Sequence, residues 1–285
     1  MKKPDTMALM PEERIDPDEP AHLRDAAGSA PPIHRYLPDA DLADLVRRHW
    51  IPVWSLPAGT STVQRVLQYP VCLLVIEAEA AMLVGPTTGL GTRELSGSGW
   101  AFGTLLQPAA GALLLGGPVS GLVDAARPLA GLAGIDGERL AAGVRAAMAA
   151  DPGSEAGHRV AAGLVEEQLR ALGPVDEEGL LINRIVEHTE GSAEVRRVAQ
   201  VCEEFAITER SLQRLCARRV GLGPKWLIQR RRLQEAAAML RNRATAFDLA
   251  AVAADLGYAD QAHFSRDFHA VTGLTPGRFA AELRD

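Results

Sequence analysis

The chain has 285 residues, of which 47% are hydrophobic, and a formal net charge of −6 at pH 7. This length is enough for two domains and a sizeable core. No apolar run approaches the ~20 residues of a membrane-spanning helix, so we expect no membrane partner. Its three cysteines form no CxxC pair, which argues against a disulfide framework or a zinc site and favours a reducing cytoplasm.

The charge is unevenly distributed along the chain. Residues 1–190 hold 15 basic and 25 acidic residues, whereas residues 191–285 hold 15 basic and 11 acidic residues. A basic module joined to an acidic one is typical of a sensor combined with a DNA-binding domain. The weight of Ala, Gly and Arg also suggests a GC-rich bacterial genome.

The first segment, residues 1–32, is rich in Pro, Asp and Glu and shows no period. This composition predicts a mobile tail. An arm that docks on another domain is the alternative, and the sequence does not choose between the two.

Residues 39–50 are expected to form a helix, because four apolar side chains recur at helical spacing: Leu42, Leu45, Val46 and Trp50. Short β-like runs separated by Gly and Pro turn signals follow, at residues 51–56, 62–69, 71–78, 81–84 and 100–106. Many short strands with such turns indicate a small barrel or sandwich. We therefore expect an α+β chain with a β-rich domain at residues 33–135.

Two short helices are expected next, at residues 108–115 and 118–132. Amphipathic helices follow at residues 138–150 and 155–172, the second capped by Ser154. We expect residues 136–175 to form a helical linker that either dimerises or packs inside the chain. The sequence therefore leaves a monomer or a homodimer open.

The first half shows no catalytic signature: GxSxG, HExxH, Walker A and Rossmann patterns are all missing. Its histidines lack Cys or His partners at metal spacing. We therefore expect no enzyme, no metal site and no cofactor. Pockets for small molecules are mostly apolar and aromatic, which makes four residues candidates for lining one: Trp50, Trp54, Trp100 and Phe102. The alternative is that these are simply the largest core residues.

Residues 208–232 carry eight basic residues against one acid. Positions four apart share a helix face, so Arg210, Arg214 and Arg218 line up, with Gln213 beside them. An apolar-periodic helix precedes this one across a short turn, which is the layout of a helix-turn-helix. One such helix alone could be a solvated charged helix.

A second copy of this layout lies at residues 248–272. An apolar stripe at helical spacing ends at Gly257, where a residue with positive φ is needed. Asp260 is a suitable N-cap for the next helix, and Gly273 closes it. The repeat favours two helix-turn-helix units over a solvated charged helix.

Three sequence motifs characterise this C-terminal region: SLQRLC (residues 211–216), GLGPK (221–225) and LGYADQAHFSRDFHAVTGLTPGRF (256–279). With them, the last hundred residues resemble the DNA-binding domain of AraC/XylS-type transcriptional regulators. The resemblance implies an all-α domain at residues 176–285, with two helix-turn-helix units joined by one long helix at 224 to about 242. It departs from the family at Cys216, where Phe is common.

The resemblance implies a sequence-specific regulator that binds double-stranded DNA and contacts RNA polymerase. Its N-terminal domain would bind a small-molecule effector or dimerise. In the first unit it implies DNA contacts from Thr208, Arg210, Ser211, Gln213, Arg214, Arg218 and Lys225. In the second unit the contacts are Gln261, Ala262, His263, Ser265 and Arg266, and residues 230–232 are further candidates for phosphate contacts. The alternative function is a helix-turn-helix protein that acts mainly through protein partners.

Overall fold

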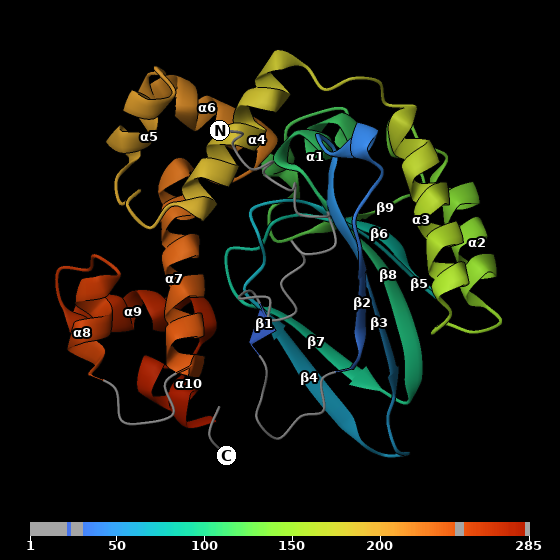
Figure 1. Ribbon diagram of the computed structural model, residues 1–285, viewed down its shortest axis with the longest axis horizontal. Coiled ribbons are helices and arrows are strands. Elements are labelled where there is room, and N and C mark those ends of the chain that lie inside the picture. Colours follow the sequence, from blue (N-terminus) through green and yellow to red (C-terminus); the bar gives the residue numbers. More distant parts are fainter. Residues whose placement is uncertain (1–21, 24–30, 243–247, 283–285) are drawn as a thin grey trace, which may run out of the picture.

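The computed structural model describes residues 22–23, 31–242 and 248–282, which form a β-rich N-terminal part and an all-helical C-terminal part (Figure 1). The expected α+β class is thereby confirmed. We call residues 22–23 and 31–175 the N-terminal part and the described residues from 176 to 282 the C-terminal part. Most of the expected mobile tail lies outside the described residues, but β1 (His22–Leu23) pairs with β4 (Ser61–Val66).

Two antiparallel sheets build the described N-terminal part. The smaller has the strand order β1–β4–β7 and the larger the order β2–β3–β8–β5–β6–β9. The remaining strands are β2 (Ile33–Tyr36), β3 (Val46–Ser55), β5 (Leu73–Glu77), β6 (Ala81–Val84), β7 (Gly91–Ser96), β8 (Ser98–Leu106) and β9 (Ala126–Pro128). The strands expected from the sequence are present, whereas β1, β2, β7 and β9 were not predicted.

The prediction of a helix at residues 39–50 is wrong. Only Ala40–Leu42 form a short 3-10 turn (η2), and the chain then enters β3. Ile51 is fully buried on one face of β3, while Trp50 lines a cavity on the other. Because both faces of this strand are covered, apolar residues do not alternate cleanly with polar ones, and their spacing imitates a helix.

Helices α2 (Gly137–Met148) and α3 (Glu155–Arg170) cover one face of the larger sheet (Figure 1). Both were expected from the sequence, and Ser154 caps α3 as predicted. Their apolar side chains share one buried cluster with the sheet, which includes Leu140, Val144, Met148, Val165, Leu169, Leu74 and Phe102. Packing inside the chain therefore accounts for the apolar faces of both helices.

Helix α1 (Pro108–Leu115) follows β8 directly, as expected. The second short helix, expected at residues 118–132, is only a 3-10 turn, η3 (Val119–Leu122). The chain then forms β9 at the edge of the larger sheet.

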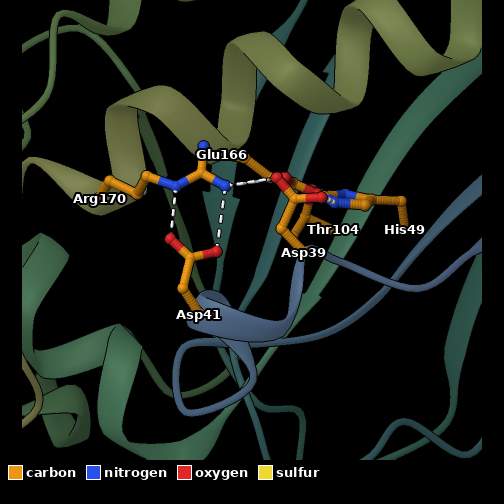
Figure 2. A network of polar contacts seen from close by, with 6 residues as sticks. All are labelled: Asp39, Asp41, His49, Thr104, Glu166 and Arg170. Carbon is orange, nitrogen blue, oxygen red and sulfur yellow. Dashed lines mark hydrogen bonds and ion pairs between the residues drawn. The ribbon is translucent and has the colours of Figure 1, made fainter.

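A buried polar network joins α3 to the larger sheet (Figure 2). His49 of β3 is fully buried; its Nδ1 lies 2.9 Å from Oγ1 of Thr104, and its Nε2 donates to Oε1 of Glu166 at 3.1 Å. One turn further along α3, at the solvent-exposed end of this network, Arg170 donates to Asp41 of η2 at 2.7 Å. A buried polar network whose members are hydrogen-bonded favours one packing arrangement, so it fixes α3 against the face of β3 opposite the cavity.

Seven helices form the described C-terminal part: α4 (Glu177–Gly191), α5 (Val198–Glu204), α6 (Glu209–Arg219), α7 (Pro224–Asn242), α8 (Leu249–Asp255), α9 (Gln261–Thr272) and α10 (Pro276–Glu282). Figure 1 shows α5 and α6 near one end of the long helix α7, and α8 and α9 near the other. Gly257 and Gly273 end α8 and α9 with φ of 73° each, a value that glycine adopts readily. This arrangement confirms two helix-turn-helix units joined by one long helix.

Candidate nucleic-acid interface and ligand cavity

The first recognition helix, α6, presents an exposed face of basic and amide side chains. Oγ1 of Thr208 caps the helix by accepting a hydrogen bond from the backbone N–H of Ser211 at 3.2 Å. Arg210, Gln213 and Arg214 are all exposed on the outer side. Guanidinium and amide groups are the groups that hydrogen-bond guanine and adenine edges in the major groove. The face therefore has the chemistry for reading base pairs.

The last turn of α6 is tied to the start of α4. Arg218 donates to Oε2 of Glu178 at 2.7 Å. Its neighbour Arg219, with an 8% exposed side chain, forms ion pairs with Glu178 and Asp176. The Glu178 carboxylate therefore competes with a DNA phosphate for the Arg218 guanidinium.

The three consecutive arginines of α7 point into the protein. Arg230 and Arg231 are only 2% and 4% exposed, and Arg232 is half-buried. Each donates to backbone carbonyl oxygens, as Arg230 does to Thr87 at 2.8 Å. The expected phosphate contacts from these arginines are therefore wrong, whereas Lys225 at the start of α7 is exposed.

The second recognition helix, α9, begins at a strong cap. Oδ1 of Asp260 accepts a hydrogen bond from the backbone N–H of His263 at 2.7 Å. The ring of His263 stands perpendicular to that of Tyr258, with centroids 5.2 Å apart. Four of the expected contact residues are exposed and Ser265 is half-buried; the exposed ones are Gln261, Ala262, His263 and Arg266. Both recognition helices thus present their expected contact faces to solvent.

A cavity of about 610 Å³ lies between the two sheets. Alternate residues of β3 line it, because successive side chains of a strand point to opposite faces: Arg48, Trp50, Pro52 and Trp54. The remaining wall is mainly apolar and includes Leu73, Val75, Met82, Leu90 and Leu95. This size and lining suit a small organic molecule.

Two glycines of β8 make room for the tryptophan rings of the cavity. Gly103 pairs with Trp50 and Gly99 with Trp54 in the β3–β8 register. A Cβ atom at Gly103 would lie 2.1 Å from Cε2 of Trp50, and one at Gly99 would lie 2.4 Å from Cζ2 of Trp54. Any larger residue at these positions would push the rings into the cavity.

Trp100 and Phe102 do not line the cavity. Phe102 is fully buried in the core beneath α2 and α3, and Trp100 packs against the same core. Of the four aromatic candidates, the structure therefore places Trp50 and Trp54 at the cavity and the other two in the core.

The cavity wall also contains charged side chains that were not predicted to line a pocket: Arg48, Glu77 and Arg93. The guanidinium carbon of Arg48 lies 5.5 Å from the ring centroid of Tyr69, another wall residue. Burial lowers the pKa of Arg48, while Tyr69 and Glu190 oppose that shift. A period-2 reading of residues 46–55 would have placed Arg48 beside Trp50 and Trp54.

Neither a metal site nor a membrane-spanning helix is found within the described part of the chain. No group of three or more His, Cys, Asp or Glu side chains is arranged there to hold a metal ion. None of the helices there combines the length and the apolar character needed to span a bilayer.

Two family models match the chain, one within each of the two parts. Residues 201–282 match a family described as a helix-turn-helix domain. Residues 34–128 match a family described as a domain of unknown function, DUF6597. Residues 201–282 thus form an AraC-type helix-turn-helix domain. The chain is accordingly a DNA-binding transcription regulator.

Solved structures of ToxT from Vibrio cholerae are remotely similar to the chain. One apo variant of ToxT matches 87% of this chain and 100% of its own, with 10% identity and a TM-score of 0.42. A second ToxT structure matches 89% of this chain and 98% of its own, with 12% identity and a TM-score of 0.40. The fold described above does not depend on this distant likeness.

Proposed function

We propose that the chain is a sequence-specific transcriptional regulator that reads two adjacent major grooves of double-stranded DNA. The observation that carries this proposal is the pair of exposed recognition helices, α6 and α9, attached to the ends of α7. We call each helix-turn-helix unit a reading head. Because the two reading heads are joined by one continuous helix, they suit successive major grooves, about 34 Å apart on one face of the duplex. Residues 176–285 form the DNA-binding half in this proposal.

Each head has a distinct set of contacts. We assign base edges to Arg210, Gln213 and Arg214 in the first unit, and to Gln261, Ala262, His263 and Arg266 in the second. The exposed position of all seven side chains supports this assignment. Phosphate contacts fall to Thr208, Ser211, Arg218, Lys225 and Ser265. Hydroxyl and basic groups at recognition-helix ends commonly bind phosphate oxygens.

The decisive experiment is footprinting of the full-length protein on DNA upstream of its own gene, with a salt series. We expect protection across two adjacent major grooves. Arg214→Ala should lower specific affinity by about 1–3 kcal/mol and relax the preference at one base pair. Arg139→Ala, an exposed arginine on α2, is the matched control and should change neither. Equal weakening on every DNA sequence would make Arg214 a phosphate contact instead.

The N-terminal half supplies the regulation in this proposal. Residues 33–135, together with the helices of residues 136–175, would hold a small effector in the cavity between the sheets. Its tryptophan-rich, mainly apolar wall supports an effector with a large apolar surface. Dimerisation through the outer faces of α2 and α3 is the alternative route. Sedimentation of the protein with and without effector separates the two, and RNA polymerase is the expected downstream partner.

A further inference from the structure

The core of the second helix-turn-helix unit contains residues of the N-terminal part. Leu67, directly after β4, is fully buried in the same cluster as Leu233 of α7 and Phe264 of α9. Leu90, directly before β7, packs against this cluster. The first unit differs, because every residue of its apolar cluster comes from position 181 or later. Residues of the N-terminal part therefore join the apolar cluster of the second reading head alone among the described residues, although α6 of the first unit also packs against α1 and η3.

Side chains of helix α7 also form hydrogen bonds with the backbone of the two segments, residues 67–68 and 87–90. Arg230 donates to the carbonyl oxygens of Thr87, Thr88 and Gly89 at 2.8, 3.0 and 3.2 Å. One turn later, Gln234 donates to the carbonyl oxygen of Leu67 at 2.8 Å. Hydrogen bonds from a buried charged donor are stronger than neutral ones. The two segments are thus held by hydrogen bonds as well as by apolar packing.

The opposite side of these segments faces the ligand cavity. Gln68, Thr87 and Leu90 all belong to its wall. Leu90 therefore touches the cavity and also packs against the core of the second unit. Closely packed interiors transmit a displacement rather than absorbing it.

We propose that the N-terminal part positions the second reading head, and that an effector in the cavity acts on this head through residues 67–68 and 87–90. The effector half of this proposal rests on the proposed role of the cavity, whereas the positioning half does not. The effector would then change DNA binding mainly at the half of the site that α9 contacts.

Hydrogen exchange of the full-length protein tests the positioning half, with Leu67→Ala compared with Leu74→Ala. Both leucines are fully buried, but Leu74 lies in the core beneath α2 and α3. We expect Leu67→Ala to speed amide exchange in α8 and α9 by at least about tenfold and to leave α5 and α6 unchanged. Leu74→Ala should act on the larger sheet and on α2 and α3, which share its core, and leave α8 and α9 unchanged. Equal effects of both variants on α8 and α9, or none from Leu67→Ala, would overturn the proposal.

Gln234→Met provides a gentler variant if Leu67→Ala does not fold. It keeps the length of the side chain and removes only the hydrogen bond to the carbonyl oxygen of Leu67. We expect amide exchange in α8 and α9 to become about two- to tenfold faster, and exchange in α5 and α6 to stay unchanged. Unchanged exchange in α8 and α9 would count against positioning.

The effector half is tested with N-phenyl-1-naphthylamine, a neutral apolar fluorophore. Bound probe should change amide exchange at residues 86–91 and in α9, but not in α6. If the probe binds without altering α9, the proposed route is wrong while the cavity remains a ligand site. If no probe binds, the proposed role of the cavity fails together with the effector half.

Discussion

Arg218 on recognition helix α6 donates a hydrogen bond to Glu178 of α4, with 2.7 Å between the two atoms. Their side chains are 52% and 35% exposed, so solvent reaches this ion pair. A carboxylate of α4 therefore neutralises part of the basic surface expected to meet DNA.

Glu178→Gln is expected to strengthen DNA binding by about two- to fivefold at low salt, because Arg218 then loses a carboxylate that competes with phosphate. Fluorescence anisotropy across a salt series measures this, and the gain should shrink as salt screens the charges. Glu177→Gln, one residue earlier on α4, is the control. An equal gain from both variants would show a general charge effect instead of release of Arg218.

A negatively charged ligand is expected to bind the cavity more tightly than its neutral counterpart. Arg47 and Arg48 share one nearby carboxylate, Glu190, which Arg47 binds at 2.8 Å, so this trio carries a net positive charge. 1-Anilinonaphthalene-8-sulfonate should therefore bind about tenfold more tightly than N-phenyl-1-naphthylamine, which lacks only the sulfonate.

Arg48→Met separates charge from apolar contact in that comparison. The variant should lose the preference for the sulfonate and keep its affinity for the neutral fluorophore, as measured by fluorescence titration. A preference that survives in the variant would place the anion elsewhere on the protein.

Removal of His49 is expected to destabilise the protein by about 1–3 kcal/mol, since Glu166 would lose its buried donor. Urea denaturation of His49→Leu gives this value. The double variant His49→Leu with Glu166→Leu should recover most of the loss, because no buried carboxylate is then left without that donor. A double variant no more stable than the single one would show that the shape of the site matters more than its polarity.

The three free thiols are expected to react in a defined order. Burial raises the pKa of Cys72 and Cys216 to about 12, so only about one thiol in ten thousand is ionised at pH 8. Cys202 is only half-buried, although burial and nearby Glu209 also raise its pKa. Labelling with a chromogenic disulfide should modify Cys202 first and the others on unfolding. Cys202→Ser should abolish the first phase.

The C-terminal helices could be predicted from the sequence because their signals are local. Asp260 caps α9 as expected, and Gly257 and Gly273 end α8 and α9; Thr208, which caps α6, is a residue type that commonly begins helices. Caps, apolar stripes and terminating glycines lie within a few residues of the elements they define. No distant part of the chain was needed to place these helices.

The cavity could be predicted only in part, because its wall depends on which face of a strand each side chain occupies and on how the strands pair with one another. Trp50 and Trp54 share one face of β3, whereas Trp100 and Phe102 share one face of β8. Which face of β8 meets the cavity is decided by its register with β3, where Gly99 and Gly103 lie opposite the tryptophans. Register between strands about fifty residues apart is not a local property of the sequence.

The arginines of α7 were misjudged for a related reason. A run of basic residues on a helix ordinarily indicates a solvated or phosphate-binding face. Arg230 is buried because its hydrogen-bond acceptors come from Thr87, Thr88 and Gly89, more than 140 residues earlier. Nothing close to Arg230 in sequence marks those carbonyl groups as its acceptors.

The burial of Leu67 beside α7 and α9 also affects how such regulators can be recombined. A hybrid protein made by joining residues 176–285 to a foreign sensor would lack Leu67 and Leu90, and would expose the apolar surface that they cover. Such a surface promotes aggregation. A DNA-binding domain transferred in this way would therefore need the two segments that carry Leu67 and Leu90, or apolar residues of its own that cover the same surface.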